Sequence, residues 1–356
     1  MTDEVLSLFI QKYIEAGSKT SDEITFGWQG GEPTLMGLEF YEKVIHYQNK
    51  FNVKKLKILN CLQTNGLLIN LEWANFLKSE KFLVGISIDG PKDLHDYYRV
   101  DFKSQGSFDR VHKTIQLFNK IGVEYNTLTT VNIYNAKYPK EIYLYLKSVG
   151  SKFWQFIPIV ERSDSNTLTT ETVLSADYGN FLNGIFDEWV KLSDFNQISI
   201  QLFDSMLMVL LHGFSTLCVY QKTCGDCLVM EHNGAVYSCD HFVTNDFYLG
   251  NIKNFSFTEL LNSKVQREFS RKKADISDKC KKCEFLKFCF GGCPKHRENF
   301  NGTKENVLCD GYRMFFSHSI KTFQNMSQCI RLDLPKNPNG PTKINHVLKA
   351  NMQRND

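Results

Sequence analysis

The chain has 356 residues, and 42 Lys and Arg against 39 Asp and Glu give it a formal charge of +3. This length is enough for a large core in one domain or two. A near-neutral charge with 42% hydrophobic residues excludes a nucleic-acid polyelectrolyte and a disordered tail protein. No apolar run reaches the roughly 18 residues of a membrane span, and acidic charge precedes the first apolar residues, the reverse of a secretory signal. We therefore expect a cytoplasmic protein without a membrane or nucleic-acid partner.

The chain order of the predicted elements begins with a helix. Thr2 suits an N-cap, Asp3 and Glu4 suit a first turn, and apolar residues recur at helical spacing until Gly17. After this helix, β-rich runs alternate with amphipathic stretches. The runs cover 24–28, 56–62, 82–88, 123–131 and 153–159, and the stretches cover 38–51, 71–80, 108–121 and 138–149. This alternation predicts βαβ units and a parallel α/β sheet, open or closed into a barrel.

Four regions follow from this pattern. Residues 1–160 form the α/β array, and 161–217 a mostly helical connection with a loop at 163–172 and a buried helix or strand at 203–211. Residues 218–332 break into short, cysteine-rich segments that suggest a second domain, and 333–356 form a mobile tail. A crossover helix normally has a strand on each side. The opening helix therefore indicates that a first strand and its loop are absent from this chain.

Polar loops follow the first three predicted strands, where parallel α/β proteins bind ligands. In the first, Gly30 and Gly31 expose backbone groups and Glu32 offers a carboxylate to an ammonium group. Gln63 opens the second loop. The third holds Ser87 and Asp89, with Arg99 downstream as a possible carboxylate partner. Each motif alone is typical of a tight turn, but three such loops at one sheet edge predict a ligand site.

Cysteines are concentrated in the second half. Of eleven, only Cys61 precedes residue 218. In a reducing compartment a thiol-rich segment indicates metal ligation before disulfides, although the isolated Cys61 and Cys329 are typical of ordinary buried thiols. The spacing C-x9-G-x4-C from Cys224 is followed by C-x2-C-x5-C-x3-C from Cys280 and by Cys309. Eight well-placed thiolates among the ten cysteines that follow residue 217 would allow two centres, either tetrahedral zinc or cubane iron–sulfur clusters.

Taken together, the two halves resemble radical S-adenosylmethionine (SAM) enzymes with a SPASM domain. The resemblance rests on Gly30-Gly-Glu-Pro33 and on the cysteine spacing, and it extends from residue 1 to about residue 332. Within that group the sequence is most similar to anaerobic sulfatase-maturating enzymes. The motifs concerned are Trp28-Gln-Gly-Gly-Glu-Pro-Thr-Leu35, Leu62-Gln-Thr-Asn-Gly66, Val84-Gly-Ile-Ser-Ile-Asp-Gly-Pro91, Gln155-Phe-Ile-Pro158 and Val236-Tyr-Ser-Cys-Asp240. The implied fold is a partial (β/α)6 radical SAM barrel lacking its first strand, followed by a SPASM domain.

The resemblance implies roles for individual residues. Glu32 would hold the amino group of SAM, and Ser87, Asp89 and Arg99 would contact its ribose and carboxylate end. Gly30, Gly31 and Gln63 would complete the SAM site, and Asp240 would be the catalytic base. One auxiliary 4Fe–4S cluster would use Cys218, Cys224, Cys239 and Cys293, and the other Cys280, Cys283, Cys289 and Cys309. Cys227 forms a C-x2-C with Cys224 and is the main rival for the first cluster.

One family motif is missing. The family begins with a Cys-x3-Cys-x2-Cys loop that holds the SAM-binding cluster, and no such triplet precedes residue 218. We therefore expect an amino-terminal portion to be absent, a third cluster only in the full-length protein, and no SAM cleavage by these 356 residues alone.

The implied reaction converts a Cys or Ser in an unfolded sulfatase segment, Cys/Ser-x-Pro/Ala-x-Arg, to formylglycine. The implied partners are that polypeptide and a flavodoxin- or ferredoxin-like electron donor. Two alternatives remain open at this point. One is another SPASM peptide maturase, for example one that forms thioether crosslinks, and the other is a zinc-stabilised binding module without catalysis.

Overall fold

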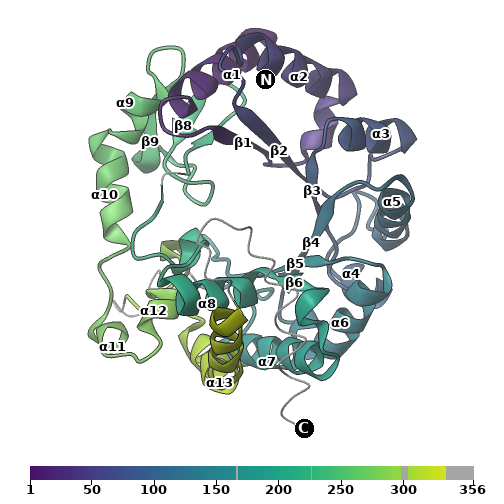
Figure 1. The fold of residues 1–356 in the computed structure, drawn as a ribbon, viewed down its shortest axis with the longest axis vertical. Helices are drawn as coiled ribbons and strands as arrows, with labels where there is room; N and C mark the ends of the chain where they lie inside the picture. The colour runs from purple at the N-terminus through teal and green to yellow at the C-terminus, as the bar shows by residue number, and fades with distance from the viewer. Residues whose placement is uncertain (166, 226, 298–303, 334–356) are drawn as a thin grey trace. The chain divides into compact units, whose positions relative to one another are not determined.

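The computed structural model describes residues 1–165, 167–225, 227–297 and 304–333, and the side chains as far as Arg331. Of the predicted tail 333–356, Asp333 is the last residue of a helix, and the rest lies outside the described residues. Strands and helices alternate through the first half, as the sequence pattern predicts (Figure 1). The elements of this half are α1 Asp3–Gly17, β1 Glu23–Trp28, η1 Pro33–Met36, α2 Leu38–Phe51, β2 Lys57–Thr64, α3 Leu71–Ser79, β3 Leu83–Ser87, α4 Lys92–His95, α5 Phe108–Ile121, β4 Tyr125–Val131, η2 Asn135–Lys137, α6 Pro139–Ser148 and β5 Phe153–Pro158.

The second half is mainly helical. Its elements are α7 Ser175–Lys191, η3 Asp194–Asn196, β6 Ser199–Ile200, α8 Gln201–His212, η4 Cys218–Tyr220, β7 Val229–Met230, β8 Ala235–Tyr237, η5 Asn245–Phe247, β9 Tyr248–Asn251, α9 Phe257–Leu261, α10 Lys264–Lys272, α11 Asp278–Lys281, α12 Leu286–Cys289, η6 Pro294–Arg297 and α13 Cys309–Asp333. The 203–211 segment, left open as helix or strand, is helical. The 25-residue helix α13 and the two-residue strand β6 are absent from the sequence prediction.

The central sheet has six strands in the order β1-β2-β3-β4-β5-β6. The pairs β1–β2, β4–β5 and β5–β6 are parallel, and Ile24 lies opposite Ile58 in the first of them. In β1 every second residue is buried, which is the pattern of a strand with one covered face. Consecutive strands are neighbours, as expected for right-handed βαβ crossovers.

The chain divides into two compact units. The first contains Met1–Gly85, Leu117–Glu124 and Lys222–Asp275, and the second contains Ile86–Gln116, Tyr125–Gln221 and Ile276–Asp356. The cysteine-rich segment is thus represented in both units. Among the helices that the structure describes, none is long and apolar enough to cross a membrane.

In the first unit, helix α1 packs on the antiparallel sheet β7-β8-β9. Its N-cap Thr2 accepts the Val5 N–H at 3.4 Å, and Val5 joins a buried cluster with Val236, Ile252 and Leu260. On the same helix, Lys12 donates to the carbonyl oxygens of Ile252 and Phe255, at 2.5 and 3.0 Å. The opening helix therefore shares a core with residues more than 200 positions later.

The core of the second unit is aromatic. Phe186 of α7, Phe203 of α8 and Phe315 of α13 are buried, with ring centroids 5.7 Å apart for the first two and 5.5 Å for the last two. Phe323 of α13 lies 5.3 Å from Phe186. Each buried Phe removes a large apolar area from water, so α13 is anchored along its length and holds Cys309 at its first turn.

Candidate functional site

In the first unit, one carboxylate ties the loop after β1 to the loop after β2. Glu32 accepts the Thr34 backbone N–H at 3.0 Å and the Thr34 hydroxyl at 2.6 Å. It also accepts the Thr64 hydroxyl and the Asn65 backbone N–H, both at 2.7 Å. Three of these donors reach Oε1 and only Asn65 reaches Oε2, so Oε2 keeps capacity for another donor. Glu32 therefore orders both loops and can still accept one further hydrogen bond.

Three other predicted SAM-site residues lie at the surface of this unit. Gly30 and Gly31 are exposed with φ values of +92° and +52°, and Gln63 is exposed near the end of β2. The contacts of Glu32 with Thr34, Thr64 and Asn65 were not predicted. Thr64 and Asn65 lie within the motif Leu62-Gln-Thr-Asn-Gly66, but Glu32 is more than 30 positions earlier, so no local signal in the sequence pairs them with it.

In the second unit, Asp89 and Arg99 form a buried ion pair. Arg99 Nε lies 2.5 Å from Asp89 Oδ2, and Nη2 lies 3.2 Å from Oδ1. Asp89 also accepts the Thr130 backbone N–H at 2.8 Å and the Thr130 hydroxyl at 2.9 Å. The Asp89 side chain is 2% exposed and that of Arg99 25%. Asp89 is thus occupied with holding Arg99, whose guanidinium is the more accessible group. Ser87 is half-buried at the end of β3.

Asp240 lies on an exposed loop of the first unit, directly after Cys239. The Cys239 thiol donates to Asp240 Oδ1 at 3.2 Å. The loop is fixed by backbone bonds from Ser238 N–H to the Phe247 carbonyl and from Phe242 N–H to the Cys239 carbonyl, both 3.1 Å. Phe242 and Phe247 also contact each other, with ring centroids 5.0 Å apart. The carboxylate is therefore solvent-accessible on a supported turn.

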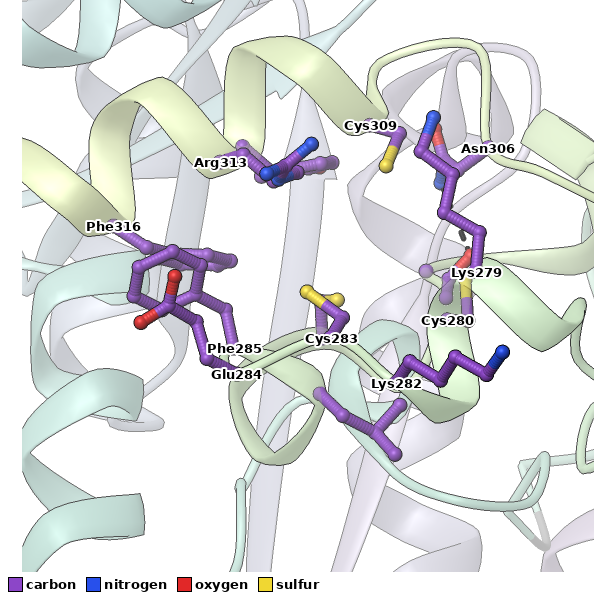
Figure 2. Close-up of a pocket in the computed structure, with 15 residues that line it drawn as sticks. Lys279, Cys280, Lys282, Cys283, Glu284, Phe285, Asn306, Cys309, Arg313 and Phe316 are labelled. Atoms are coloured by element: carbon purple, nitrogen blue, oxygen red, sulfur yellow. Dashed lines mark hydrogen bonds between the residues drawn. The ribbon is translucent and has the colours of Figure 1, made fainter.

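A thiol-lined pocket of about 240 Å³ lies in the second unit. All four cysteines predicted for one auxiliary cluster line it: Cys280, Cys283, Cys289 and Cys309. Figure 2 shows the sulfurs of Cys283 and Cys309 directed toward a common space, with Arg313 and Phe316 along one side. The structure thus brings these four residues to one pocket, and their role as ligands of one cluster stays a prediction.

Short capped helices and turns deliver these thiols. Ser277 caps α11 by accepting the Cys280 N–H at 3.2 Å, and Cys283 N–H bonds to the Cys280 carbonyl at 3.1 Å. Such a turn brings both thiols of a C-x2-C to one side. Asn306 precedes α13, and its carbonyl accepts the Cys309 N–H at 2.9 Å. These bonds fix the backbone at Cys280, Cys283 and Cys309.

The four thiols influence one another electrostatically. Burial, helped by the neighbouring Cys280, Cys283 and Cys309 and opposed by a hydrogen bond from the Gly291 N–H, raises the pKa of Cys289 to about 11. Burial also raises the pKa of Cys309, and the Lys279 ammonium opposes that shift. A positively charged metal centre bound by these residues would favour their thiolate form.

A set of four thiolates is chemically suited to a 4Fe–4S cluster as well as to a tetrahedral zinc ion. Tetrahedral zinc needs four sulfurs at about 2.3 Å from one ion. Within the described residues, no three Cys, His, Asp or Glu side chains are grouped as ligands of one ion. A cubane binds its thiolates through four different iron atoms, so its ligands surround a larger body. All eleven cysteines are free of disulfides, and these four surround a cavity, so they fit a 4Fe–4S cluster.

The predicted second set is divided between the two units. Cys224 and Cys239 belong to the first unit, and Cys218 and Cys293 to the second. Their gathering around one cluster stays a prediction. Cys227, the rival ligand, is exposed in the first unit.

A left-handed turn between Cys289 and Cys293 supports the thiol pocket. Gly292 has φ +71°, and a Cβ there would lie 2.1 Å from Asn306 Nδ2. Asn306 is buried and donates from Nδ2 to the Gly291 carbonyl at 3.4 Å. Arg297 donates from Nε to the same carbonyl at 2.8 Å. The turn therefore requires a residue without a side chain.

We expect Gly292→Ala to lower the free energy of unfolding by about 1–3 kcal/mol, because it adds left-handed strain and a clash with Asn306. Urea unfolding of the two proteins measures this difference. Gly27→Ala is the matched control, because a Cβ at Gly27 has no atom within 4 Å and its φ is not positive. Equal unfolding midpoints for the Gly292 variant and wild type would contradict the proposed strain.

Comparison with known proteins agrees with this geometry. The model of the SPASM iron-sulfur cluster-binding domain matches residues 209–284, and the model of the radical SAM superfamily matches residues 9–146. With its α/β sheet and thiol-lined pocket, the chain is a radical SAM protein with a SPASM domain, a class whose cofactors are SAM and 4Fe–4S clusters.

Relatives narrow this class. A serine-type anaerobic sulfatase-maturating enzyme of Bacteroides thetaiotaomicron is 40% identical over 98% of this chain and 87% of its own length. A cysteine-type enzyme of Clostridium novyi is 38% identical over 86% of this chain and 83% of its own. The solved structure of native anSMEcpe with bound AdoMet and Cp18Cys peptide has a TM-score of 0.85 at 36% identity, covering 92% of this chain and 91% of that one. The chain belongs to the anaerobic sulfatase-maturating enzymes.

Proposed function

We propose that this protein oxidises a Cys or Ser of a sulfatase peptide to formylglycine. The observation that carries the proposal is the 40% identity to a sulfatase-maturating enzyme across 98% of the chain. The pocket formed by Cys280, Cys283, Cys289 and Cys309 adds a cluster-binding donor set. The structure with AdoMet and a peptide bound supports a peptide substrate and SAM as co-substrate.

The oxidation requires three removals from the substrate residue: a hydrogen atom from Cβ, a proton from Sγ or Oγ, and an electron. A Ser then yields the aldehyde directly, and the thioaldehyde from a Cys exchanges sulfur for oxygen with water. When bound, SAM and the clusters supply the radical and accept the electron. The chain's own task is to bind, orient and deprotonate.

Asp240 is the proposed base. It is an exposed carboxylate next to a proposed cluster ligand, Cys239. A base must reach the proton it removes within about 2.6–3.2 Å. Its accessibility lets it approach a peptide hydroxyl or thiol.

The proposed SAM contacts keep the residue assignment that the family resemblance implies, with each residue's own surroundings as support. Glu32 accepts the ammonium group through Oε2, which has one protein donor. Gly30 and Gly31 present backbone groups, and Gln63 is accessible beside them. Arg99 binds the carboxylate of SAM, while its Nε forms an ion pair with Asp89. Ser87 contacts the ribose.

The proposed cluster ligands keep the sequence assignment. Cys280, Cys283, Cys289 and Cys309 hold one cluster, and Cys218, Cys224, Cys239 and Cys293 hold the other. An unfolded sulfatase segment is the proposed peptide partner, and a flavodoxin- or ferredoxin-like protein is the proposed electron donor.

Peptide conversion tests the proposal. The assay uses a form of the protein that carries a Cys-x3-Cys-x2-Cys segment, incubated anaerobically with SAM, a reductant and either a Cys-x-Pro-x-Arg or a Ser-x-Pro-x-Arg peptide. We expect mass spectrometry to show an aldehyde in place of the CH2SH or CH2OH group. A peptide with Ala at that position is the control. Formation of a thioether, or no conversion of either peptide, would refute the proposal, and the first result would indicate a different peptide maturase.

A further inference from the structure

A closed ring of hydrogen bonds connects Arg99 to three buried residues of the second unit. The Asp89 backbone N–H donates to His95 Nδ1 at 3.2 Å. His95 Nε2 lies 2.9 Å from Ser107 Oγ, and the Ser107 hydroxyl donates to the Arg99 carbonyl oxygen at 2.8 Å. The Arg99 guanidinium returns to the Asp89 carboxylate at 2.5 Å. Each of the four residues thus touches two others.

This ring determines the direction of every proton in it. Because His95 Nδ1 accepts a hydrogen bond, the neutral imidazole carries its proton on Nε2 and donates to Ser107. Ser107 then has its own proton available for the Arg99 carbonyl. Burial, together with the nearby Arg99 and against the carboxylates of Asp89 and Asp96, lowers the pKa of His95 to about 4. The neutral form that the ring requires is therefore the form present at neutral pH.

Three residues of the ring are buried, and the Arg99 guanidinium is its accessible group. His95, Asp89 and Ser107 are 0%, 1% and 6% exposed. Arg99 Nε bonds to Asp89, and Nη2 bonds to Asp89 and to the Thr130 hydroxyl at 3.2 Å. Within the described residues no hydrogen bond involves Nη1, so two guanidinium protons remain for an anion.

The backbone of the segment is held by the same residues. Ser107 N–H donates to the Arg99 carbonyl at 3.1 Å, and Arg99 N–H donates to the His95 carbonyl at 3.1 Å. The Arg99 carbonyl therefore receives two donors, both from Ser107. Loss of the Ser107 hydroxyl removes one of them and leaves the His95 Nε2 proton without an acceptor, which is costly in a buried site.

We propose that His95 and Ser107 are positioning residues that orient Arg99 to bind the carboxylate of SAM. This inference rests on the proposed function. His95 and Ser107 touch no ligand in it. Ser107 acts by holding the Arg99 backbone, and His95 acts by holding the backbone of Asp89, whose carboxylate binds the guanidinium. The Nη1 group of Arg99 therefore has a fixed direction before SAM binds.

A comparison of two ligands tests the inference. SAM and decarboxylated SAM differ by the one group that Arg99 is proposed to recognise. Their dissociation constants are measured by anaerobic equilibrium dialysis on the reconstituted protein that carries the first-cluster segment. We expect Ser107→Ala to reduce the preference for SAM about fivefold by weakening its binding, with affinity for the decarboxylated analogue unchanged. Ser107→Thr keeps the hydroxyl and restores the preference.

A double-mutant cycle separates positioning from a general structural effect. Arg99→Lys removes the fork that Ser107 orients, so Ser107→Ala should have no further effect on the preference in the Arg99→Lys background. His95→Phe should behave as Ser107→Ala, and iron content checks that each variant is folded. An unchanged preference in folded Ser107→Ala, or an equal loss in both backgrounds, overturns the inference. Failure of the wild type to bind SAM overturns the proposed function itself.

Discussion

The double variant Cys283→Ala/Cys309→Ala is expected to lose one complete four-iron cluster per chain. Both residues line the 240 Å³ pocket, one from the turn after α11 and one from the first turn of α13. Two remaining thiolates cannot hold a cubane that requires four. Iron and acid-labile sulfide should each fall by about four atoms per chain relative to the wild type, while the other proposed cluster keeps its contribution.

Cys329→Ala, on helix α13, is the control for this experiment. Cys329 lies on α13 with Cys309 but is not among the residues that line the pocket. Cys329→Ala should therefore keep full iron and sulfide. If the double variant keeps the iron content of the wild type, or if the pocket yields zinc without sulfide, this cluster assignment is wrong.

Asp240→Asn is expected to reduce the rate of peptide conversion by at least about a hundredfold, because general-base catalysis contributes roughly 10²–10⁴ in rate. The amide keeps the size of the side chain but cannot take the proton of the substrate hydroxyl or thiol. The initial rate is measured with saturating SAM in the assay described above, and iron content is measured in the same samples.

Asp246→Asn is the matched control for Asp240→Asn. Asp246 is an exposed carboxylate in η5, only six positions farther along the same loop. Its replacement removes the same charge and should leave the rate within about twofold, as expected for a surface change. A similar small effect for Asp240→Asn, with clusters intact, would assign the base to another residue.

The regular helices and strands were predictable because each shows its own hydrophobic periodicity within a short segment of sequence. The predicted bounds 38–51 and 108–121 agree with α2 and α5, and the five predicted strands all occur. Strand β6 contains only Ser199 and Ile200, which is too short for any periodicity. Helix α13 was missed because the cysteine spacing dominated the interpretation of that region, although Phe315 and Phe323 recur on a helical face.

Of the candidate site, the grouping of the cysteines at one pocket was expected from the sequence. The family resemblance implied that Cys280, Cys283, Cys289 and Cys309 act together, and these four line the thiol pocket, whereas the spacing alone left open which cysteines share a centre. The environment of Glu32 was not predictable, because Thr64 reaches it from the next strand, 32 positions away. The engagement of Asp89 by Thr130 likewise depends on the pairing of strand ends. Such contacts come from tertiary packing, and no local pattern contains them.

The attachment of α1 to the β7-β8-β9 sheet has a consequence for any attempt to divide this protein. Val5 covers Val236, Ile252 and Leu260, and Lys12 occupies two carbonyls beside them. A fragment that starts at Cys218 would present those side chains to water and leave the carbonyls without the ammonium. The predicted domain boundary at residue 218 is therefore not a place where the polypeptide can be cut. Excising the carboxyl-terminal half for separate expression would yield an aggregation-prone product.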